Sequence, residues 1–241
     1  QFYNYLKQMC TSPQAQELLV TGEENTVIIL PLELDYDMVF AGLILPLMRK
    51  NLLDLDKFLQ YQSAINLAKV VLEIEKIDIQ SSKDDVASFR SMLVAIAKDI
   101  RVIILKLADI LNLARHQKSL SATEQAKLHF EVVNIYIPLA SRLGLSYIKS
   151  ELQDLDLSYT QPNEYKRLMK ILAEESKDRQ KQMEKVEQEL RQMLVELNIK
   201  GEIQGRIKHI SSIYNKLHQK NYTLNQLYDL TAVRVLVQTV N

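Results

Sequence analysis

The stretch GRIKHISSIYNKLHQKNYTLNQLYDLTAVRVLV, residues 205–237, contains the elements that best indicate the fold. A segment from about Lys208 to Lys220 has the spacing of a short amphipathic helix, and the apolar run LTAVRVLVQ after it is typical of a β-strand. The segment IKGEIQG, which precedes the helix, alternates in polarity and carries two glycines. We therefore expect a truncated α/β domain to begin near residue 199.

The rest of the chain is expected to be helical. Its 241 residues include only 5 glycines and 5 prolines, which is little turn material for an all-β fold. The segment 88–117 is apolar on more than one face and predicts a central core helix. Its large apolar residues recur at spacings of three and four: Leu93, Ile96, Ile100, Ile103, Leu107 and Leu111.

Two later helices carry recognisable end signals. Ser121 and Glu124 form a capping-box pattern, and the helix that they begin is expected to close at Gly144. Pro162 indicates the first turn of a helix that continues to about Leu197.

The middle of this last helix, residues 174–182, is polar all round. We expect the helix to bridge two parts of the molecule and to pack through its apolar ends, residues 168–172 and 183–197.

Composition excludes several classes of protein. Lys+Arg and Asp+Glu both total 30, so a non-specific attraction to nucleic acid is not expected. Specific DNA binding is not expected either. The single cysteine, Cys10, excludes an internal disulfide framework and fits a cytoplasmic location. The longest apolar run, residues 38–48, is about half the length of a membrane span and contains Pro46. The chain begins with Gln, and we expect it to be a fragment of a longer polypeptide.

The helix that begins near Lys208 places Lys208, Ser212 and Lys216 on one face, and we call these three residues the phosphate-binding face. Two cations and a hydroxyl in one stripe suit a row of phosphates. The helix amino terminus, with Arg206 nearby, also favours an anion. The apolar residues Ile210, Ile213 and Leu217 occupy another face.

Asp229 and Arg234 flank the start of the last strand. A carboxylate at this position suits Mg²⁺ between phosphates, and a guanidinium in an apolar strand either pairs with a carboxylate or lies against a planar ligand. On spacing alone a plainer interpretation is favoured, with a solvated basic helix, a turn aspartate and an edge-strand arginine. In a regular strand, moreover, Asp229 and Arg234 point to opposite faces, so the site requires an irregular strand start or a ligand wrapped round the strand end.

The motifs GRIKHISSIYNKL and YDLTAVRV, preceded by NIYIPLASRLGLSYIKSELQDLDLSYTQPNEYKRL, resemble the RelA/SpoT family of long stringent-response enzymes. The resemblance implies a mainly α fold with an HD-type hydrolase domain over 1–120. It further implies connecting helices over 121–198 and the truncated start of a nucleotidyltransferase-like synthetase domain over 199–241. The family's synthetase moves the β,γ-pyrophosphate of ATP onto the 3′-hydroxyl of GTP or GDP, giving (p)ppGpp and AMP.

The resemblance also implies roles for individual residues. Arg206 and Arg234 clasp the adenine ring, the phosphate-binding face holds the ATP phosphates, and Asp229 binds the catalytic Mg²⁺. These roles reverse the preference for the plainer interpretation. The family's second metal-binding glutamate and its guanine-stacking tyrosine would lie beyond Asn241.

The amino-terminal half departs from the family's active hydrolases, which hold a metal with a histidine, a His-Asp pair and a distal aspartate, beside a Glu-Asp pair. The matching positions here are Leu45-Pro46 for the first pair, Arg49-Lys50 for the second and Gly22 near the first histidine. Apolar groups and cations do not hold Mn²⁺, so none is expected in the helical half. The distal aspartate persists as Asp109, which we interpret as a hydrogen-bonded structural carboxylate.

None of the four histidines is assigned to catalysis, although His209, beside Lys208, comes nearest to a site. The sequence thus predicts part of a (p)ppGpp synthetase with an inactive hydrolase half, and a fragment that is inactive by itself. Two alternatives are kept: a protein-binding regulatory module with a vestigial nucleotide site, and a bifunctional synthetase and hydrolase. Preference for GTP or GDP and oligomeric state do not follow from this sequence, and in the family ribosome contact depends on regions absent from this chain.

Overall fold

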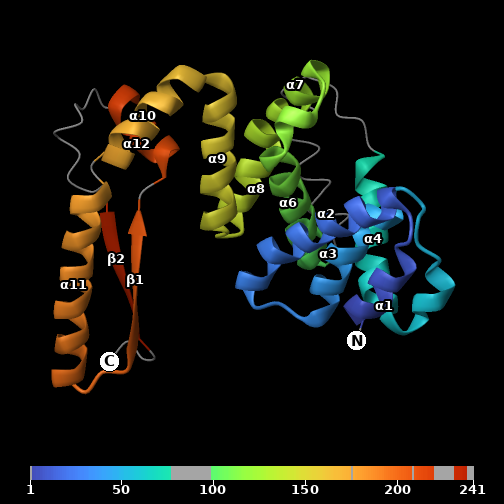
Figure 1. Ribbon diagram of the computed structural model, residues 1–241, viewed down its shortest axis with the longest axis horizontal. Helices are drawn as coiled ribbons and strands as arrows, with labels where there is room; N and C mark the ends of the chain where they lie inside the picture. The colour runs from blue at the N-terminus through green and yellow to red at the C-terminus, as the bar shows by residue number, and fades with distance from the viewer. Residues whose placement is uncertain (1, 77–98, 175, 208, 220–230, 238–241) are drawn as a thin grey trace. The chain divides into compact units, whose positions relative to one another are not determined.

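The computed structural model describes residues 2–76, 99–174, 176–207, 209–219 and 231–237. It confirms a mainly α-helical chain that ends in a strand, a helix and a second strand (Figure 1). None of the helices within these ranges is long and apolar enough to cross a membrane. The elements are α1 Phe2–Met9, α2 Pro13–Ile29, η1 Leu30–Leu32, α3 Tyr36–Arg49, η2 Leu55–Tyr61, α4 Gln62–Glu75, α6 Ile100–Arg115, η3 Gln117–Ser119, α7 Ala122–Glu131, the π-helical turn η4 Val132–Tyr136, α8 Ile137–Arg142, α9 Ser146–Thr160, α10 Pro162–Glu174, α11 Ser176–Glu196, β1 Gly201–Ile207, α12 Ile210–Gln219 and β2 Thr231–Val237.

The chain divides into two compact units, Gln1–Leu152 and Gln153–Asn241. The boundary lies inside α9, so this helix carries the chain from the first unit to the second. The expectation that the helix after Pro162 bridges two parts is therefore wrong, because α10 and α11 both belong to the second unit. These two units are defined by contacts between residues, and not by family domains. The domain bounds 1–120, 121–198 and 199–241 therefore stay predictions.

Helices α2, α3, α4 and α6 form the core of the first unit, and α6 is its central helix, as the sequence predicts. Asp35 and Asp99 cap α3 and α6 by accepting a backbone N–H of the first turn, which the helices themselves leave unbonded.

The prediction that Ile100 belongs to the core is wrong. Its side chain is 55% exposed, because it is the first residue of α6. Leu93 and Ile96 lie outside the described residues. The largest side chains with almost no exposed surface are Phe58, Leu6, Ile28, Ile29, Met38, Ile44, Leu45, Leu47, Ile65, Leu105, Leu107 and Leu111.

Gly22 sets how closely α2 approaches α3. A Cβ atom at this position would collide with the backbone carbonyl of Leu43, so any larger residue would force the two helices apart. Gly22 is also the position that the family resemblance aligns near the first metal-binding histidine of active hydrolases. The close packing of α2 on α3 leaves no room for a histidine there.

The end signals read from the sequence are confirmed. Ser121 and Glu124 form the full capping box of α7, Gly144 has a φ of 72°, and α10 begins at Pro162. The helix predicted to continue to about Leu197 is assigned as α10 and α11 on either side of residue 175, which is not described. Figure 1 shows that the two helices run in different directions.

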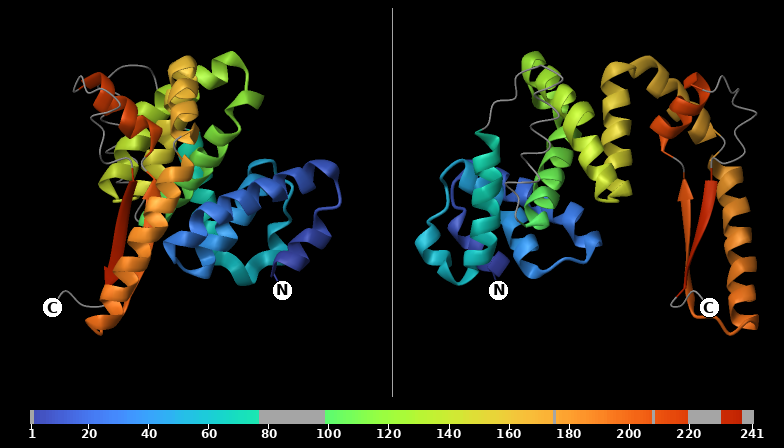
Figure 2. Two further views of the ribbon diagram at one scale, coloured as in Figure 1. Left: turned by 60° about the vertical axis from the view of Figure 1, so that its left-hand side comes forward. Right: turned by 180° about the vertical axis from the view of Figure 1, so that it is seen from behind.

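In the second unit, α11 runs along the antiparallel pair β1 and β2 (Figure 2). Met183 and Glu187 lie against Gly205, and Leu194 lies against Gly201, so β1 uses its glycines where the helix comes close. Four residues of the predicted apolar end do not pack as expected and are exposed: Val186, Met193, Val195 and Leu197. Val195 is 79% exposed, because the two strands cover only one stripe of the helix.

Candidate functional site

The predicted phosphate-binding face lies on α12, which runs from Ile210 to Gln219 and so matches the predicted helix closely. Ser212 and Lys216 are both half-buried and stand one turn apart on the same side of the helix. Lys208 lies outside the described residues, so its place on this face stays a prediction. The structure therefore shows the positions of two of the three residues of the phosphate-binding face.

An apolar cluster holds the opposite side of α12. Ile210 and Ile213 are buried against Leu157 of α9 and Leu168 of α10. Leu217 packs against the same cluster. The predicted apolar face is therefore confirmed, and it turns Ser212 and Lys216 away from the core.

The strand register places positions 206 and 234 on one face of the two-stranded sheet. Position 234 pairs with 204, and position 206 pairs with 232. Paired positions share a face in an antiparallel sheet, and so do positions two apart in one strand. The glycines that meet α11, Gly201 and Gly205, belong to the opposite face. The adenine-clasp positions therefore lie together, on the face away from α11.

Arg234 is exposed, and no hydrogen bond or ion pair joins it to another residue that the structure describes. The sequence left two interpretations of this guanidinium, pairing with a carboxylate or contact with a planar ligand. No carboxylate partner is found among the residues that the structure describes. Asp229 lies outside these ranges, and the strand described begins after it, at Thr231. Its metal role and its orientation relative to Arg234 remain untested.

The amino terminus of α12 is already occupied by a carboxylate. Asp154 Oδ1 accepts the backbone N–H of Ser211 at 2.7 Å, and Asp154 Oδ2 lies 2.9 Å from Nδ1 of His209. The anion that the helix dipole favours at this end is therefore Asp154. No local sequence pattern marks Asp154 as the partner of this helix, because it lies 57 residues before Ser211.

The first unit contains four charged residues that are linked to one another by ion pairs: Arg49, Glu75, Lys106 and Asp109. We call them the Arg49 cluster. Arg49 Nη2 lies 2.6 Å from Glu75 Oε1 and 2.7 Å from Asp109 Oδ2. Lys106 Nζ lies 2.8 Å from the same Glu75 oxygen and 3.4 Å from Asp109 Oδ2. Two cations and two carboxylates thus balance, and they join the ends of α3 and α4 to the middle of α6.

The cluster shifts the pKa values of Arg49 and Glu75. Burial alone would lower the pKa of the Arg49 guanidinium, but the charge of Asp109 and the hydrogen bond to Glu75 outweigh burial and raise that pKa. Burial alone would raise the pKa of Glu75, but the hydrogen bond from Arg49 and the charge of Lys106 lower it to about 2. Both groups are therefore held in their charged forms.

Acid is expected to destabilise the protein through Glu75. Its pKa is about 2 in the folded protein against an ordinary value of 4.5, so its stabilising effect is complete above pH 4.5 and is lost as the pH falls toward 2. We expect this loss to be about 2–3 kcal/mol in urea unfolding measured between about pH 6 and pH 2.5. Glu75→Gln should flatten this pH dependence, whereas Glu73→Gln, at an exposed neighbour, should keep it. An unchanged slope in Glu75→Gln would show that the cluster does not act this way.

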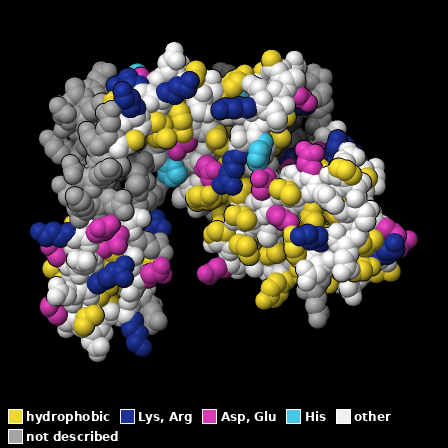
Figure 3. All heavy atoms as spheres, viewed as in Figure 1, with side chains coloured by type: hydrophobic (Ala, Val, Ile, Leu, Met, Phe, Trp, Pro, Cys, Tyr) yellow, Lys and Arg dark blue, Asp and Glu magenta, His cyan; other side chains and the backbone are white. Residues whose placement is uncertain are grey.

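The Arg49 cluster lines a pocket of about 810 Å³ between α2, α3, α4, α6 and α7. Lys50, Lys127 and His116 also line it, together with Glu17, Glu24, Glu124 and Glu131. Asn112, next along α6, is buried and donates to the backbone carbonyl of Thr21 and to Oδ1 of Asn25. The pocket therefore mixes both signs of charge. On the face drawn in Figure 3, side chains of both charges are likewise interspersed.

The pocket residues do not fit the metal of the family's hydrolases. The Asp109 carboxylate accepts a hydrogen bond from Arg49, as the interpretation of a hydrogen-bonded carboxylate predicts. Leu45 and Pro46 are buried in the apolar core. A divalent cation beside Asp109 would meet the charges of Arg49 and Lys106, and within the described ranges no three His, Cys, Asp or Glu residues converge to hold a metal.

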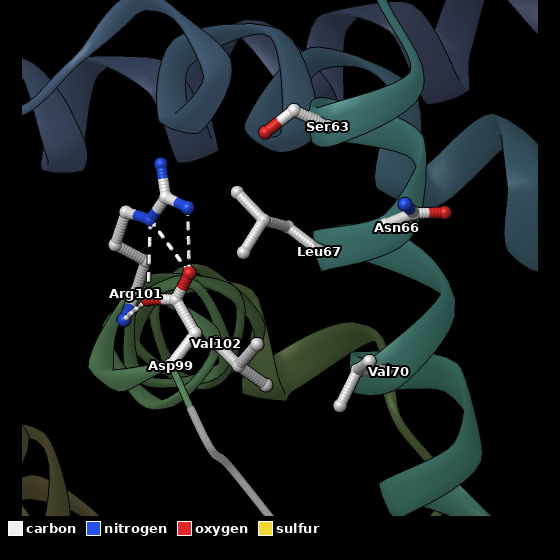
Figure 4. A pocket seen from close by; sticks show the side chains of 7 residues that line it. All are labelled: Ser63, Asn66, Leu67, Val70, Asp99, Arg101 and Val102. Carbon is white, nitrogen blue, oxygen red and sulfur yellow. Dashed lines mark hydrogen bonds and ion pairs between the residues drawn. The ribbon is translucent and has the colours of Figure 1, made fainter.

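A second pocket, of about 470 Å³, lies between α4 and the start of α6 and contains none of the predicted site residues. In Figure 4, Arg101 folds back over Asp99, and Leu67 and Val102 point toward the space between the two helices. Arg101 forms ion pairs with Asp99, the N-cap residue of α6, and with Asp35. These pairs hold the Asp99 side chain in its capping position.

Comparison with known families gives two matches. Residues 3–146 match the HD domain, and residues 205–241 match a region found in RelA/SpoT proteins. The first match covers most of the unit that contains the Arg49 cluster. The second begins in β1 and includes α12 and β2.

Similar proteins carry two kinds of name. A GTP pyrophosphokinase of Escherichia coli (strain K12) is 34% identical over an alignment of 242 positions, which covers 97% of this chain and 32% of that protein. A GTP pyrophosphokinase of Myxococcus xanthus is 39% identical over 152 residues, covering 63% of this chain and 20% of that protein. A probable guanosine-3′,5′-bis(diphosphate) 3′-pyrophosphohydrolase of Synechocystis is 34% identical over 180 residues, covering 74% and 24%. The chain spans about a third or less of the length of these relatives.

Proposed function

Because the chain belongs to the RelA/SpoT family, with an HD domain over residues 3–146, we propose that it is part of a GTP pyrophosphokinase. The full-length protein would transfer pyrophosphate from ATP to the 3′-hydroxyl of GTP or GDP and so make (p)ppGpp in the stringent response. The chain by itself would be inactive, because the acceptor site would require further residues. We also propose a cytoplasmic location, in keeping with the one cysteine, which is free and buried.

The residues of the second unit would bind ATP. Positions 206 and 234 share a face of the sheet, which supports an arginine clasp on the two sides of the planar adenine. Ser212 and Lys216 project from α12 away from its apolar cluster, which supports their contact with the phosphates. Together with Lys208 they would neutralise the charge of the triphosphate.

In the transfer, the oxygen of the acceptor 3′-hydroxyl would form a bond to the β-phosphorus of ATP and release its proton to solvent. The bond between the β-phosphorus and the oxygen that bridges it to the α-phosphorus would break, and AMP would leave with that oxygen. Positioning of the two nucleotides and neutralisation of phosphate charge supply most of the acceleration in such reactions. Mg²⁺ held by Asp229 would contribute to this neutralisation. The cationic side chains of α12 would orient the phosphates for in-line attack.

The hydrolase half would be inactive, and the observation that carries this proposal is the 2.7 Å bond between Arg49 and Asp109. The guanidinium occupies the carboxylate that the metal of an active hydrolase would need. The collision of any Cβ at Gly22 with Leu43 supports the same conclusion, because a metal-binding histidine does not fit there.

A bifunctional enzyme is the second candidate, because relatives in Synechocystis and Haemophilus influenzae carry the name of a pyrophosphohydrolase. One experiment separates the two. Full-length protein is incubated with labelled ATP and GTP for synthesis, and with labelled ppGpp and Mn²⁺ for hydrolysis. We expect synthesis and no release of pyrophosphate. Mn²⁺-dependent hydrolysis that is lost on Asp109→Ala would establish the bifunctional enzyme, and the absence of synthesis would favour a regulatory module.

A further inference from the structure

We propose that Asp154 is a positioning residue, which sets the rotation of α12 and thereby the direction of Ser212 and Lys216. The proposal rests on the proposed function, since it concerns the helix that would bind the ATP phosphates. Asp154 lies on α9, outside the residues 205–241 that match the RelA/SpoT region. It would thus act on nucleotide binding through α12, without contact with the nucleotide.

The two carboxylate oxygens of Asp154 bind two consecutive parts of the α12 start. Oδ1 accepts the Ser211 backbone N–H, the second of the helix, which has no partner within α12 itself. Oδ2 is bonded to the ring of His209, whose carbonyl oxygen accepts the backbone N–H groups of Ser212 and Ile213 at 3.1 and 3.2 Å. Asp154 therefore does for α12 what an N-cap side chain does for most helices.

This cap is needed because α12 has none of its own. The residue before the helix is His209, whereas Ser, Thr, Asp and Asn are the side chains that cap a helix efficiently. The Asp154 and His209 side chains are 16% and 24% exposed, so water competes little for their bond. A charged acceptor that is largely removed from water makes a stronger hydrogen bond than a neutral one.

Apolar packing alone does not fix the rotation of the helix. The contacts of Ile210 and Ile213 with Leu157 and Leu168 hold α12 in place, but hydrophobic contacts have no preferred direction and allow small rotations. Ser212 follows Ser211 directly, so the hydrogen bond that holds the Ser211 N–H also sets where the Ser212 hydroxyl points. The Asp154 charge also disfavours a phosphate at the helix end and leaves the side-chain face as the place for it.

The test measures binding of a non-hydrolysable ATP analogue to the full-length protein by calorimetry. Asp154→Ala is expected to weaken binding about tenfold, or about 1.4 kcal/mol. Asp154→Asn should stay within about threefold of the unchanged protein, because its amide oxygen still accepts the Ser211 N–H. Glu189→Gln, which makes the same charge change at an exposed site on α11, is the control and should bind normally. Binding of the acceptor nucleotide should not change.

A cap that only stabilises the fold would lower the melting temperature of Asp154→Ala and leave the affinity of the folded protein for ATP unchanged. That result overturns the proposal. If Lys216→Ala still weakens ATP in that case, the proposed function stands, and if it does not, the nucleotide site fails as well. Should Asp154→Ala not fold, His209→Ala, which keeps the Ser211 bond, is expected to weaken ATP about threefold, and an unchanged affinity would again overturn the proposal.

Discussion

Asp229→Asn in the full-length protein is expected to lower the rate of pyrophosphate transfer at least about 1000-fold, since a bound metal supplies several kcal/mol of charge stabilisation in the transition state. Asparagine keeps the size of the side chain and removes the charge that would bind Mg²⁺. The melting temperature should change little. The measurement is the initial rate of (p)ppGpp formation from labelled ATP at saturating Mg²⁺.

A matched control is Asp56→Asn, which makes the same change at an exposed position of the first unit. Its rate should equal that of the unchanged protein. A well-folded Asp229→Asn protein with a near-normal rate would remove Asp229 from the metal site and, with it, the best candidate for a catalytic residue in this chain.

Arg49→Met is expected to destabilise the protein by about 2–4 kcal/mol. Removing one member of a buried ion pair costs about 3–5 kcal/mol because it leaves the partner charge uncompensated, and the partial exposure of Arg49 reduces this cost. Two carboxylates, Glu75 and Asp109, would then share the single cation Lys106. Urea unfolding at neutral pH measures the loss.

Lys50→Met provides the control, since Lys50 is exposed beside Arg49 and should cost less than about 0.5 kcal/mol. A double-mutant cycle then isolates the Arg49–Asp109 bond. Asp109→Asn should cost clearly less in the Arg49→Met protein than in the unchanged one, with a coupling of about 1 kcal/mol or more. Equal losses for Arg49→Met and Lys50→Met would mean that the cluster is not needed for stability.

Much of the local structure could be read from the sequence, because its causes lie within a few residues. The capping box of Ser121 and Glu124, the positive φ of Gly144 and the helix start at Pro162 each depend on one turn of backbone. The same holds for α12, where Ile210 and Ile213 recur at a helical spacing and so predict which side is buried. The same spacing predicts that Ser212 and Lys216 lie on the side of α12 that faces away from the apolar cluster.

Contacts between distant parts of the chain were decided only by the tertiary structure. The family resemblance aligns Arg49 with an acidic residue of the active hydrolases, but the bond of Arg49 to Asp109 joins residues 60 apart. The cap of α12 by Asp154 spans 57 residues, and neither partner carries a local signal of the other. By itself the sequence therefore determined the helical class, the helix ends and the buried side of α12, because these follow from backbone hydrogen bonding and periodicity. Packing alone decided which charges meet, because only the folded chain brings their helices within hydrogen-bond distance.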